Sequence, residues 1–318
     1  MIRALIVAGA LLAGLTGSVA AQVTLRVGDQ KGNAQAVMDA AGVLKDVPYR
    51  IEWKEFPAAA PLLEALGAGA VDAGLVGDAP FTFAAAAGAP VRAIATVRQS
   101  QEGLAILVPK DSPIRSFADL KGKTIATGRG SIGHQLVLAA LEANGLSAAD
   151  VRLAFLAPSD AKVAYTRGSV DAWSTWEPYV SQEEVLFGAR RIQTAEGLTP
   201  GLSFIIARPE AIRDRRAALD DFVRRQAAAR AWSRSHVAGY AESWGRLMGI
   251  PAEVALHWLQ RARIEVTPID DGVVAGEQQT IDLYHRAGLI GRRLQASELV
   301  DRSFGEAITS APAAAEAN

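Results

Sequence analysis

A cluster of aromatic and acidic residues lies at 171–179, where two tryptophans, a tyrosine and a glutamate occur together in a chain that is only 6% aromatic. A rigid aromatic surface beside a polar group is what a small-molecule pocket needs. Pro178 follows Glu177 directly, so a helix is interrupted there and the aromatic side chains come from a strand end or a loop. We therefore predict that Trp173 or Trp176 forms one wall of a small-molecule site.

A second candidate is the glycine-rich segment 128–134, which follows a predicted strand and opens a predicted helix. The segments 28–33 and 77–80 follow other predicted strands in the same way. Open α/β sheets bind ligands at the carboxyl ends of their strands, and a helix N-terminus offers free N–H groups and a partial positive charge. With Ser131 and Gln30 as neutral donors, this pattern predicts a site for a small monoanion such as a sulfonate.

Three polar residues near these segments have more than one interpretation. Asp78 precedes Pro80 at a predicted helix start, so its carboxylate is expected to cap the helix and orient the loop, since a free carboxylate would repel an anion. His134 either donates to the ligand or is a buried structural histidine. Glu177 either contacts the ligand or braces the loop or the interface between lobes.

Motifs of other functional classes give little support for catalysis or nucleotide binding. The three glycines of 128–133 form a dinucleotide fingerprint, but they lie mid-chain and no acidic residue ends a following strand at the expected distance. Nucleophile elbows of the Gly-x-Ser-x-Gly type, Walker loops and His-x-x-x-His pairs are absent. The sequence contains no cysteine, which excludes thiol catalysis, Cys-ligated metals and disulfides. We expect no catalytic residue, no metal and no cofactor.

The length and net charge of the chain limit the number of domains and the kind of partner to be expected. A chain of 318 residues exceeds what one compact core usually takes, so two domains are expected. The 33 basic and 34 acidic residues give a net charge of −1. Such a balance does not favour nucleic acid or an anionic membrane surface as the partner.

The N-terminus has the pattern of a secretory signal peptide. Arg3 supplies a positive start, residues 4–15 form an uncharged apolar run, and residues 18–21 are small and suit a cleavage site. A membrane anchor would need a longer apolar span. Because the chain has no cysteine, it cannot carry a lipid attached to a cysteine side chain. We expect residues 1–21 to be removed and the mature protein to be periplasmic.

Strands alternate with helices along the chain, which favours a parallel α/β arrangement. An internal echo accompanies this alternation. The unit Gly-x-Val-Asp-Ala occurs at 69–73 and at 168–172, each time before an acid and a proline, and the segments 31–33 and 129–131 lie at nearly the same offset. The echo predicts two similar half-molecules that face each other.

The chain is expected to pass between the two lobes twice. The predicted boundaries are residues 22–108 plus 206–309 for the first lobe, 109–205 for the second lobe, and 310–318 for a disordered tail. The hinge is expected near Pro109 and 203–207. Three tryptophans of the C-terminal region are expected to pack in the core: Trp232, Trp244 and Trp258.

Several motifs, taken together, are shared with one known family. They are the segments 26–32, 55–58, 63–66, Gly77-Asp78-Ala79-Pro80, 119–123, 130–134, 170–173 and Trp176-Glu177-Pro178-Tyr179. In these motifs the chain resembles the periplasmic substrate-binding proteins of aliphatic sulfonate ABC transporters, which belong with taurine and nitrate binders. The resemblance covers nearly the whole mature chain.

The resemblance implies a two-lobed fold of the type II periplasmic-binding-protein kind. Each lobe is then a mixed sheet flanked by helices, with a two-strand hinge and the ligand in the cleft. It implies a monomeric binding protein, not an enzyme, that delivers an organosulfonate to a membrane permease driven by a cytoplasmic ATPase. The family's anion-contacting positions map onto Gln30, Asp78, Ala79, Ser131, His134, Trp176 and Glu177.

Two departures from the family pattern leave the ligand open. Close relatives often carry a run of serines where this chain has Ser131-Ile132-Gly133, and some have aspartate at the position of Glu177. One alternative is a binding protein for taurine, nitrate, an aromatic sulfonate or carboxylate, or a pyrimidine precursor. Another is a cofactor-biosynthesis enzyme on the same fold, against which the signal peptide argues, because such enzymes work in the cytosol.

Overall fold

A computed structural model describes residues 22–30 and 33–311 of the protein. The predicted signal peptide, Lys31 and Gly32, and all but the first two residues of the predicted tail lie outside the described residues. Within the described ranges, no helix is both long enough and apolar enough to cross a membrane.

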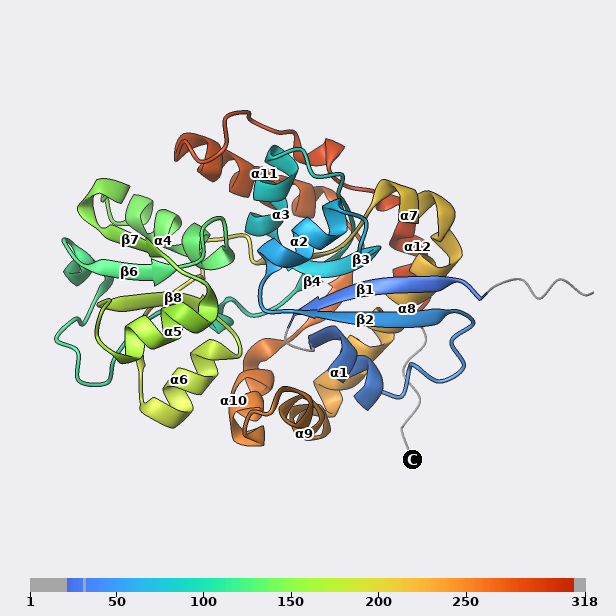
Figure 1. The fold of residues 1–318 in the computed structure, drawn as a ribbon, viewed down its shortest axis with the longest axis horizontal. Helices are drawn as coiled ribbons and strands as arrows, with labels where there is room; N and C mark the ends of the chain where they lie inside the picture. The colour runs from blue at the N-terminus through green and yellow to red at the C-terminus, as the bar shows by residue number, and fades with distance from the viewer. Residues whose placement is uncertain (1–21, 31–32, 312–318) are drawn as a thin grey trace, which may run out of the picture.

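The chain forms two lobes, each built on one mixed β-sheet (Figure 1). The first sheet has the order β11-β4-β10-β3-β1-β2. Its strands are β1 (Thr24–Gln30), β2 (Arg50–Phe56), β3 (Ala73–Gly77), β4 (Arg92–Arg98), β10 (Leu202–Ala207) and β11 (Glu265–Thr267). β1 is parallel to β2 and β3, whereas β10 is antiparallel to both of its neighbours.

The second sheet repeats this arrangement in the order β7-β6-β8-β5-β9. Its strands are β5 (Leu104–Val108), β6 (Thr124–Thr127), β7 (Arg152–Phe155), β8 (Ala172–Trp176) and β9 (Arg190–Thr194). β6 is parallel to β7 and β8, and β5 is antiparallel to β8 and β9. Each sheet therefore has three parallel strands followed by one antiparallel strand, so the predicted two-lobed fold with mixed sheets is confirmed.

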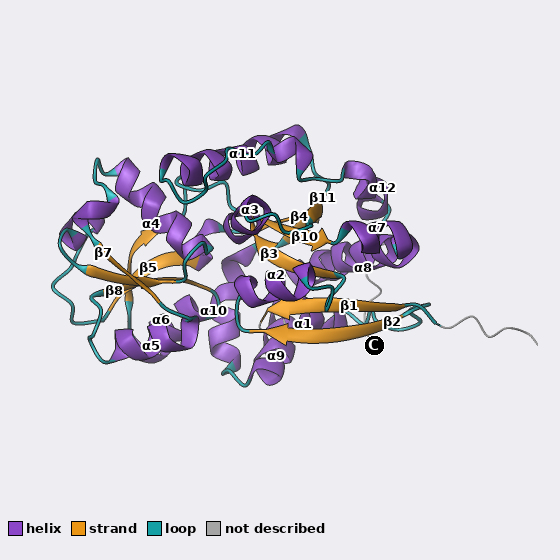
Figure 2. Ribbon diagram, turned by 45° about the horizontal axis from the view of Figure 1, so that its top comes forward, coloured by secondary structure: helices purple, strands orange, loops and turns teal. Residues whose placement is uncertain are grey.

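Helices cover both faces of each sheet (Figure 2). Those of the first lobe are α1 (Asn33–Ala40), α2 (Ala59–Gly67), α3 (Asp78–Ala86), α7 (Pro209–Asp214), α8 (Arg216–Ser235), α9 (Val237–Met248), α10 (Ala252–Ala262), α11 (Asp271–Arg286) and α12 (Gly305–Thr309). Those of the second lobe are α4 (Ile132–Ala143), α5 (Pro158–Thr166) and α6 (Tyr179–Phe187).

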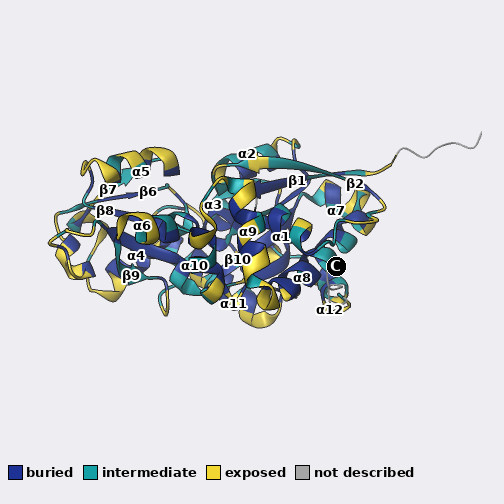
Figure 3. Cartoon of the chain, turned by 90° about the horizontal axis from the view of Figure 1, so that it is seen from below, coloured by how far each residue is buried: buried dark blue, intermediate teal, exposed yellow. Residues whose placement is uncertain are grey.

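Alternation along the strands divides each lobe into two cores, one on each sheet face. In β10, Phe204 and Ile206 pack into one core of the first lobe, and Ile205 and Ala207 pack into the other. Figure 3 shows the result: the central strands are mostly buried, the edge strand β2 is not, and exposed residues gather on the outer sides of the helices.

The sequence echo corresponds to one structural position used twice. Asp72 stands just before β3, and its Oδ2 accepts from the backbone N–H of Arg26 at 2.9 Å. Asp171 stands just before β8, and its Oδ2 accepts from the N–H of Thr124 at 2.8 Å. Each carboxylate thus ties the start of its strand to the neighbouring parallel strand, so the repeated aspartate has the same task in both lobes.

The lobe boundaries differ from the prediction. The chain crosses between sheets at 99–103, before β5, and at 195–201, before β10. β5 therefore belongs to the second lobe, although it was predicted in the first, and all of β10 belongs to the first. Pro109 and 203–207 are consequently not the crossing points. A short apolar run specifies a buried strand but not its partners, which is why the sequence placed β5 wrongly.

The two crossing segments contact each other. Thr199 Oγ1 donates to Gln101 Oε1 at 2.9 Å. Gly201 has a φ of +68°, and a Cβ there would lie 1.9 Å from the Gln101 side chain. The hydrogen bond and the glycine contact bring the two segments together as one connection.

Candidate functional site

A cavity of about 810 Å³ lies between the lobes. From the second lobe it is lined at the ends of three parallel strands and in the segments that follow them: 128–132, 155–158 and 176–177. From the first lobe it is lined by the end of β1, the turn before α2, and residues of α3, α8, α9 and α10. The cavity thus lies at the carboxyl ends of strands in both sheets, where ligands of open α/β sheets bind.

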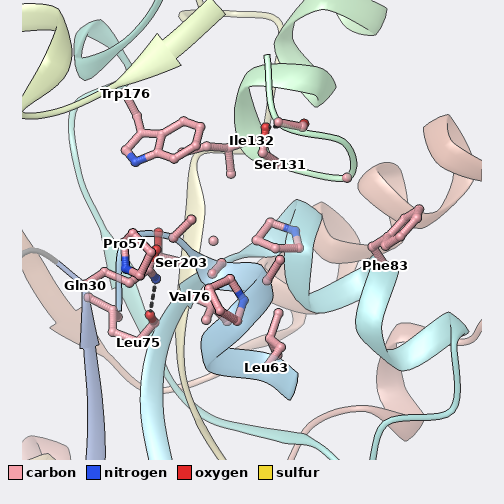
Figure 4. A pocket seen from close by; sticks show the side chains of 18 of the residues that line it. Gln30, Pro57, Leu63, Leu75, Val76, Phe83, Ser131, Ile132, Trp176 and Ser203 are labelled. Carbon is pink, nitrogen blue, oxygen red and sulfur yellow. Dashed lines mark hydrogen bonds between the residues drawn. The ribbon is translucent and has the colours of Figure 1, made fainter. Parts of the chain in front are cut away.

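Four of the predicted site residues line this cavity: Gln30, Ser131, Trp176 and Glu177. Figure 4 shows the first three, with Trp176 and Ser131 across the space from Gln30. Gln30 is the last residue of β1, and its Nε2 donates to the carbonyl oxygen of Leu75 at 2.7 Å. This hydrogen bond fixes the side chain against β3 and leaves its amide oxygen as a further polar group at the cavity.

Ser131 is the N-cap of α4, as the helix start requires. Its Oγ accepts from the N–H of His134 at 3.2 Å and donates to the carbonyl oxygen of Gly128 at 2.7 Å. Gly130 has a φ of +68°, and a Cβ there would lie 2.8 Å from the ring of Phe83 on the other lobe. The turn therefore needs glycine, and it brings the positive end of α4 to the cavity wall.

Asp78 and Ala79 do not line the large cavity. Asp78 is the first residue of α3, and Gly77 rather than Asp78 is the N-cap. Its carboxylate accepts from the N–H of Ala79 at 2.8 Å, from Gln135 Nε2 at 3.0 Å and from Thr280 Oγ1 at 2.8 Å. Burial raises the pKa of Asp78. Because Gln135 belongs to α4, Asp78 joins the two lobes, and the Ala79 N–H that an anion would use is already bonded.

His134 also does not line the cavity. Its side chain is buried, its Nδ1 accepts from the N–H of Gly130 at 3.2 Å, and its ring packs edge-on against Phe155. Burial, with the nearby charge of Arg129, lowers the pKa of His134 to about 4. A neutral imidazole that accepts a backbone hydrogen bond supports the glycine-rich turn, which is the structural interpretation of this residue.

Trp173 and Trp176 have different positions although both belong to β8. Trp173 is 2% exposed and packs between Tyr165 and Tyr179 in a core of the second lobe. Trp176 ends the strand and faces the cavity. Successive side chains of a strand point to opposite faces, so residues three apart cannot share one face.

Glu177 lines the cavity but directs its carboxylate toward α6. The two carboxylate oxygens accept from Ser181, one from its N–H at 3.0 Å and the other from its Oγ at 2.9 Å. Burial raises the pKa of Glu177 to about 7. The residue therefore braces the segment after β8, in agreement with one of its two predicted roles.

Arg230 is a cavity residue that the sequence did not indicate. It lies in α8, is 1% exposed, and donates to Tyr240 Oη at 3.0 Å and to Asn33. No carboxylate of the described residues forms an ion pair with it, and its Nε has no hydrogen-bond partner there. A buried cation without a counter-ion is energetically unfavourable, so Arg230 provides a strong reason for an anion to enter the cavity.

Most of the remaining wall is apolar. Trp244 and Trp258 are buried, as predicted for packing residues, and they also line the cavity. The other large apolar residues at the wall include Pro57, Leu63, Leu75, Val76, Phe83, Ile132 and Phe155. Among the described residues, no group of His, Cys, Asp and Glu side chains is arranged to hold a metal ion.

A family model described as NMT1/THI5 like matches residues 51–236. The chain belongs to this NMT1/THI5-like family. A curated relative, a putative aliphatic sulfonates-binding protein from Escherichia coli (strain K12), is 34% identical over 301 residues, which span 91% of this NMT1/THI5-like chain and 93% of the relative.

Solved structures agree with this assignment. The alkanesulfonate-binding protein SsuA from Xanthomonas axonopodis pv. citri, bound to MOPS, is 32% identical, with a TM-score of 0.83 over 89% of this chain and all of that chain. The periplasmic aliphatic sulphonate binding protein SsuA from Escherichia coli is 32% identical, with a TM-score of 0.77 over 87% of this chain and 92% of that one. The two-lobed fold of this NMT1/THI5-like protein is thus that of periplasmic binding proteins.

Some features of the cavity could have been predicted from the sequence, and others could not. Arg230 belongs to an arginine-rich helix whose other arginines are half-buried or, like Arg234, exposed, and nothing in the sequence distinguishes it from them. Trp258 reaches the cavity only because of where α10 packs, which the sequence does not show. Strand alternation, by contrast, could have separated Trp176 from Trp173.

Proposed function

We propose that this protein is a periplasmic solute-binding protein that captures an organosulfonate and delivers it to an ABC importer. The observation that carries the proposal is Arg230, a buried guanidinium at an apolar cavity with no carboxylate partner among the described residues. A monoanion supplies the missing charge, and an apolar cavity suits the organic part of a sulfonate.

The geometry suggests a division of tasks within the cavity. Arg230 donates to the sulfonate oxygens, because a guanidinium makes strong charge-assisted hydrogen bonds to an oxyanion. The N-terminal turn of α4 at Ser131 and Ile132 adds its partial positive charge from the opposite lobe. Trp176, Trp244 and other apolar side chains surround the hydrocarbon part. Contacts from both lobes favour the conformation in which the lobes are close together.

The lining of the cavity favours binding over turnover. Its described residues include no histidine and present no carboxylate–hydroxyl pair to the cavity, because Glu177, which accepts from Ser181 Oγ, is directed toward α6 and the hydroxyl of Ser131 is used by the helix cap. General acid–base and nucleophilic catalysis require such pairs. We therefore propose a monomeric binding protein without enzymatic activity, in agreement with the names of its relatives.

The cellular setting follows from the same relatives and from the sequence. The similar protein from Escherichia coli is named as periplasmic, and residues 1–21 have the pattern of a signal peptide. We propose export, cleavage near Ala21, and a partnership with a membrane permease and its cytoplasmic ATPase. Mass spectrometry of the protein from a periplasmic extract tests the cleavage directly.

Calorimetric titration with matched ligands tests the proposed function. Butanesulfonate and pentanoate carry the same butyl chain and differ in the anionic group; sulfate and nitrate lack a chain. We expect butanesulfonate and MOPS to bind with measurable heat and sulfate to bind more weakly than either. Binding of nitrate, pentanoate or a pyrimidine without binding of any sulfonate would show that the substrate class is wrong.

A further inference from the structure

A group of acidic and basic side chains joins the lobes outside the ligand cavity. At its centre is Arg261 of α10, in the first lobe. Its guanidinium lies 3.6 Å from Glu177 and 3.2 Å from Glu184 of the second lobe, and 3.5 Å from Glu102 of a crossing segment. One cation of the first lobe therefore contacts three carboxylates, two of which move with the second lobe.

Neighbouring side chains hold these partners in place. Glu184 of α6 also accepts from Arg191 Nε at 2.6 Å and lies 3.2 Å from His257 Nε2. Arg191 in turn lies 3.6 Å from Glu102. Because Arg191 belongs to β9 and Glu184 to α6, the second lobe presents a pre-arranged acceptor to Arg261. A pre-arranged acceptor lowers the conformational entropy lost on forming the contact.

Burial separates this group from ordinary surface ion pairs. The side chains of Glu177, Glu184 and Arg261 are 7%, 15% and 19% exposed. A second pair between the lobes, Arg286 with Glu142, has a similar separation of 3.1 Å, but its side chains are 57% and 58% exposed. Exposed pairs contribute little and partly buried networks more, so the two pairs form a natural comparison within one molecule.

Glu177 connects this group to the ligand cavity. It follows Trp176, and both residues line the cavity, whereas Arg261 does not. We propose that Arg261 is a positioning residue that fastens the two lobes together from outside the cavity and so sets how long a captured ligand is retained. A contact that favours the same lobe arrangement as the ligand is coupled to ligand binding by linkage. This role rests on the proposed binding function, but its structural effect is measurable without ligand.

The first experiment measures lobe separation in the ligand-free protein. Because the chain has no cysteine, the exposed pair Thr166→Cys and Glu242→Cys, one position in each lobe, accepts spin labels without background. At pH 8, where Glu177 is mainly ionised, Arg261→Gln should broaden the distance distribution toward longer values, Arg261→Lys should restore part of the short-distance population, and Arg286→Gln should match the parent. Identical distributions for the parent and Arg261→Gln would overturn the proposal.

The second experiment measures dissociation of butanesulfonate and MOPS by stopped-flow fluorescence of the tryptophans. Loss of a partly buried ion pair should raise the dissociation rate by about tenfold for both ligands in Arg261→Gln. The factor should be the same for both, since Arg261 touches neither. A ligand-dependent factor, or an unchanged rate, would contradict the role. If no sulfonate binds the parent protein, the distance measurement still decides whether Arg261 fastens the lobes.

Discussion

Replacement of Arg230 by methionine is expected to weaken ligand binding strongly without weakening the ligand-free fold. Methionine keeps much of the side-chain length and removes the charge. The neighbouring phenol does not lose its only partner, because Tyr240 Oη also donates to the carbonyl oxygen of Asn33 at 3.2 Å. The substitution therefore tests the charge with little disturbance of the surrounding hydrogen bonds.

The loss of ligand affinity and the unchanged stability of the ligand-free protein have different causes. Hydrogen bonds to charged groups contribute about 1.5–3 kcal/mol each, so losing the guanidinium should cost about 3–4 kcal/mol of binding, or a 100- to 1000-fold rise in Kd. In the ligand-free protein, removing a buried charge without a counter-ion offsets the loss of its hydrogen bonds. The free energy of unfolding should therefore stay within about 1 kcal/mol of the parent or increase.

Calorimetric titration with butanesulfonate and urea unfolding of the ligand-free protein measure the two quantities. Arg234→Met is the matched control, because Arg234 lies in the same helix, is exposed, and pairs with Glu265 at 3.4 Å. A Kd within threefold of the parent would remove Arg230 from the site. A fall in unfolding free energy of more than about 3 kcal/mol in Arg230→Met would instead identify Arg230 as a paired structural cation.

Three further predictions follow from the site. Trp176→Ala should raise Kd more for MOPS than for methanesulfonate in calorimetry, because the indole walls the organic part; equal effects on both ligands would exclude that role. Ser131→Ala should lower thermal stability, by about 1 kcal/mol for a lost N-cap, and should also weaken sulfonate binding; a change in neither would contradict the geometry of α4. For His134, whose folded pKa of about 4 lies below the ordinary value of 6.5, the unfolded chain binds more protons between these values. Its contribution to stability is thus complete above pH 6.5 and falls by up to about 3 kcal/mol as the pH approaches 4. Urea unfolding across this range should show a smaller fall in His134→Gln than in the exposed-site control His285→Gln, and equal falls would show that His134 titrates normally.

The general arrangement of the fold follows from local patterns in the sequence. Alternating strands and helices predicted α/β lobes, and the repeated aspartates at 72 and 171 marked the same strand start in both. Local patterns do not predict which strands pair, because β5 is a continuous apolar run that would suit either sheet. Only tertiary packing decides that it pairs with β8 and β9.

The site was predictable where it depends on chain position and not where it depends on packing between distant elements. Gln30 and Ser131 lie at a strand end and a helix start, which local sequence identifies. Arg230 reaches the cavity because α8 packs against α1, where Arg230 bonds to Asn33, and Asp78 is removed from the cavity because Gln135 and Thr280 converge on it. Both positions depend on contacts between residues that are far apart in the sequence, which local patterns do not reveal.

The place of β10 has a consequence for the order in which the protein can fold. β3 and β4 do not pair with each other; β10 lies between them and bonds to both. In the order of synthesis, β10 emerges only after every strand of the second sheet. Until then β3 and β4 present open edges, and non-local pairing of this kind is slow and favours aggregation. The lobe that begins the chain is thus the last to be completed, and it is the one that most needs protection as the chain emerges.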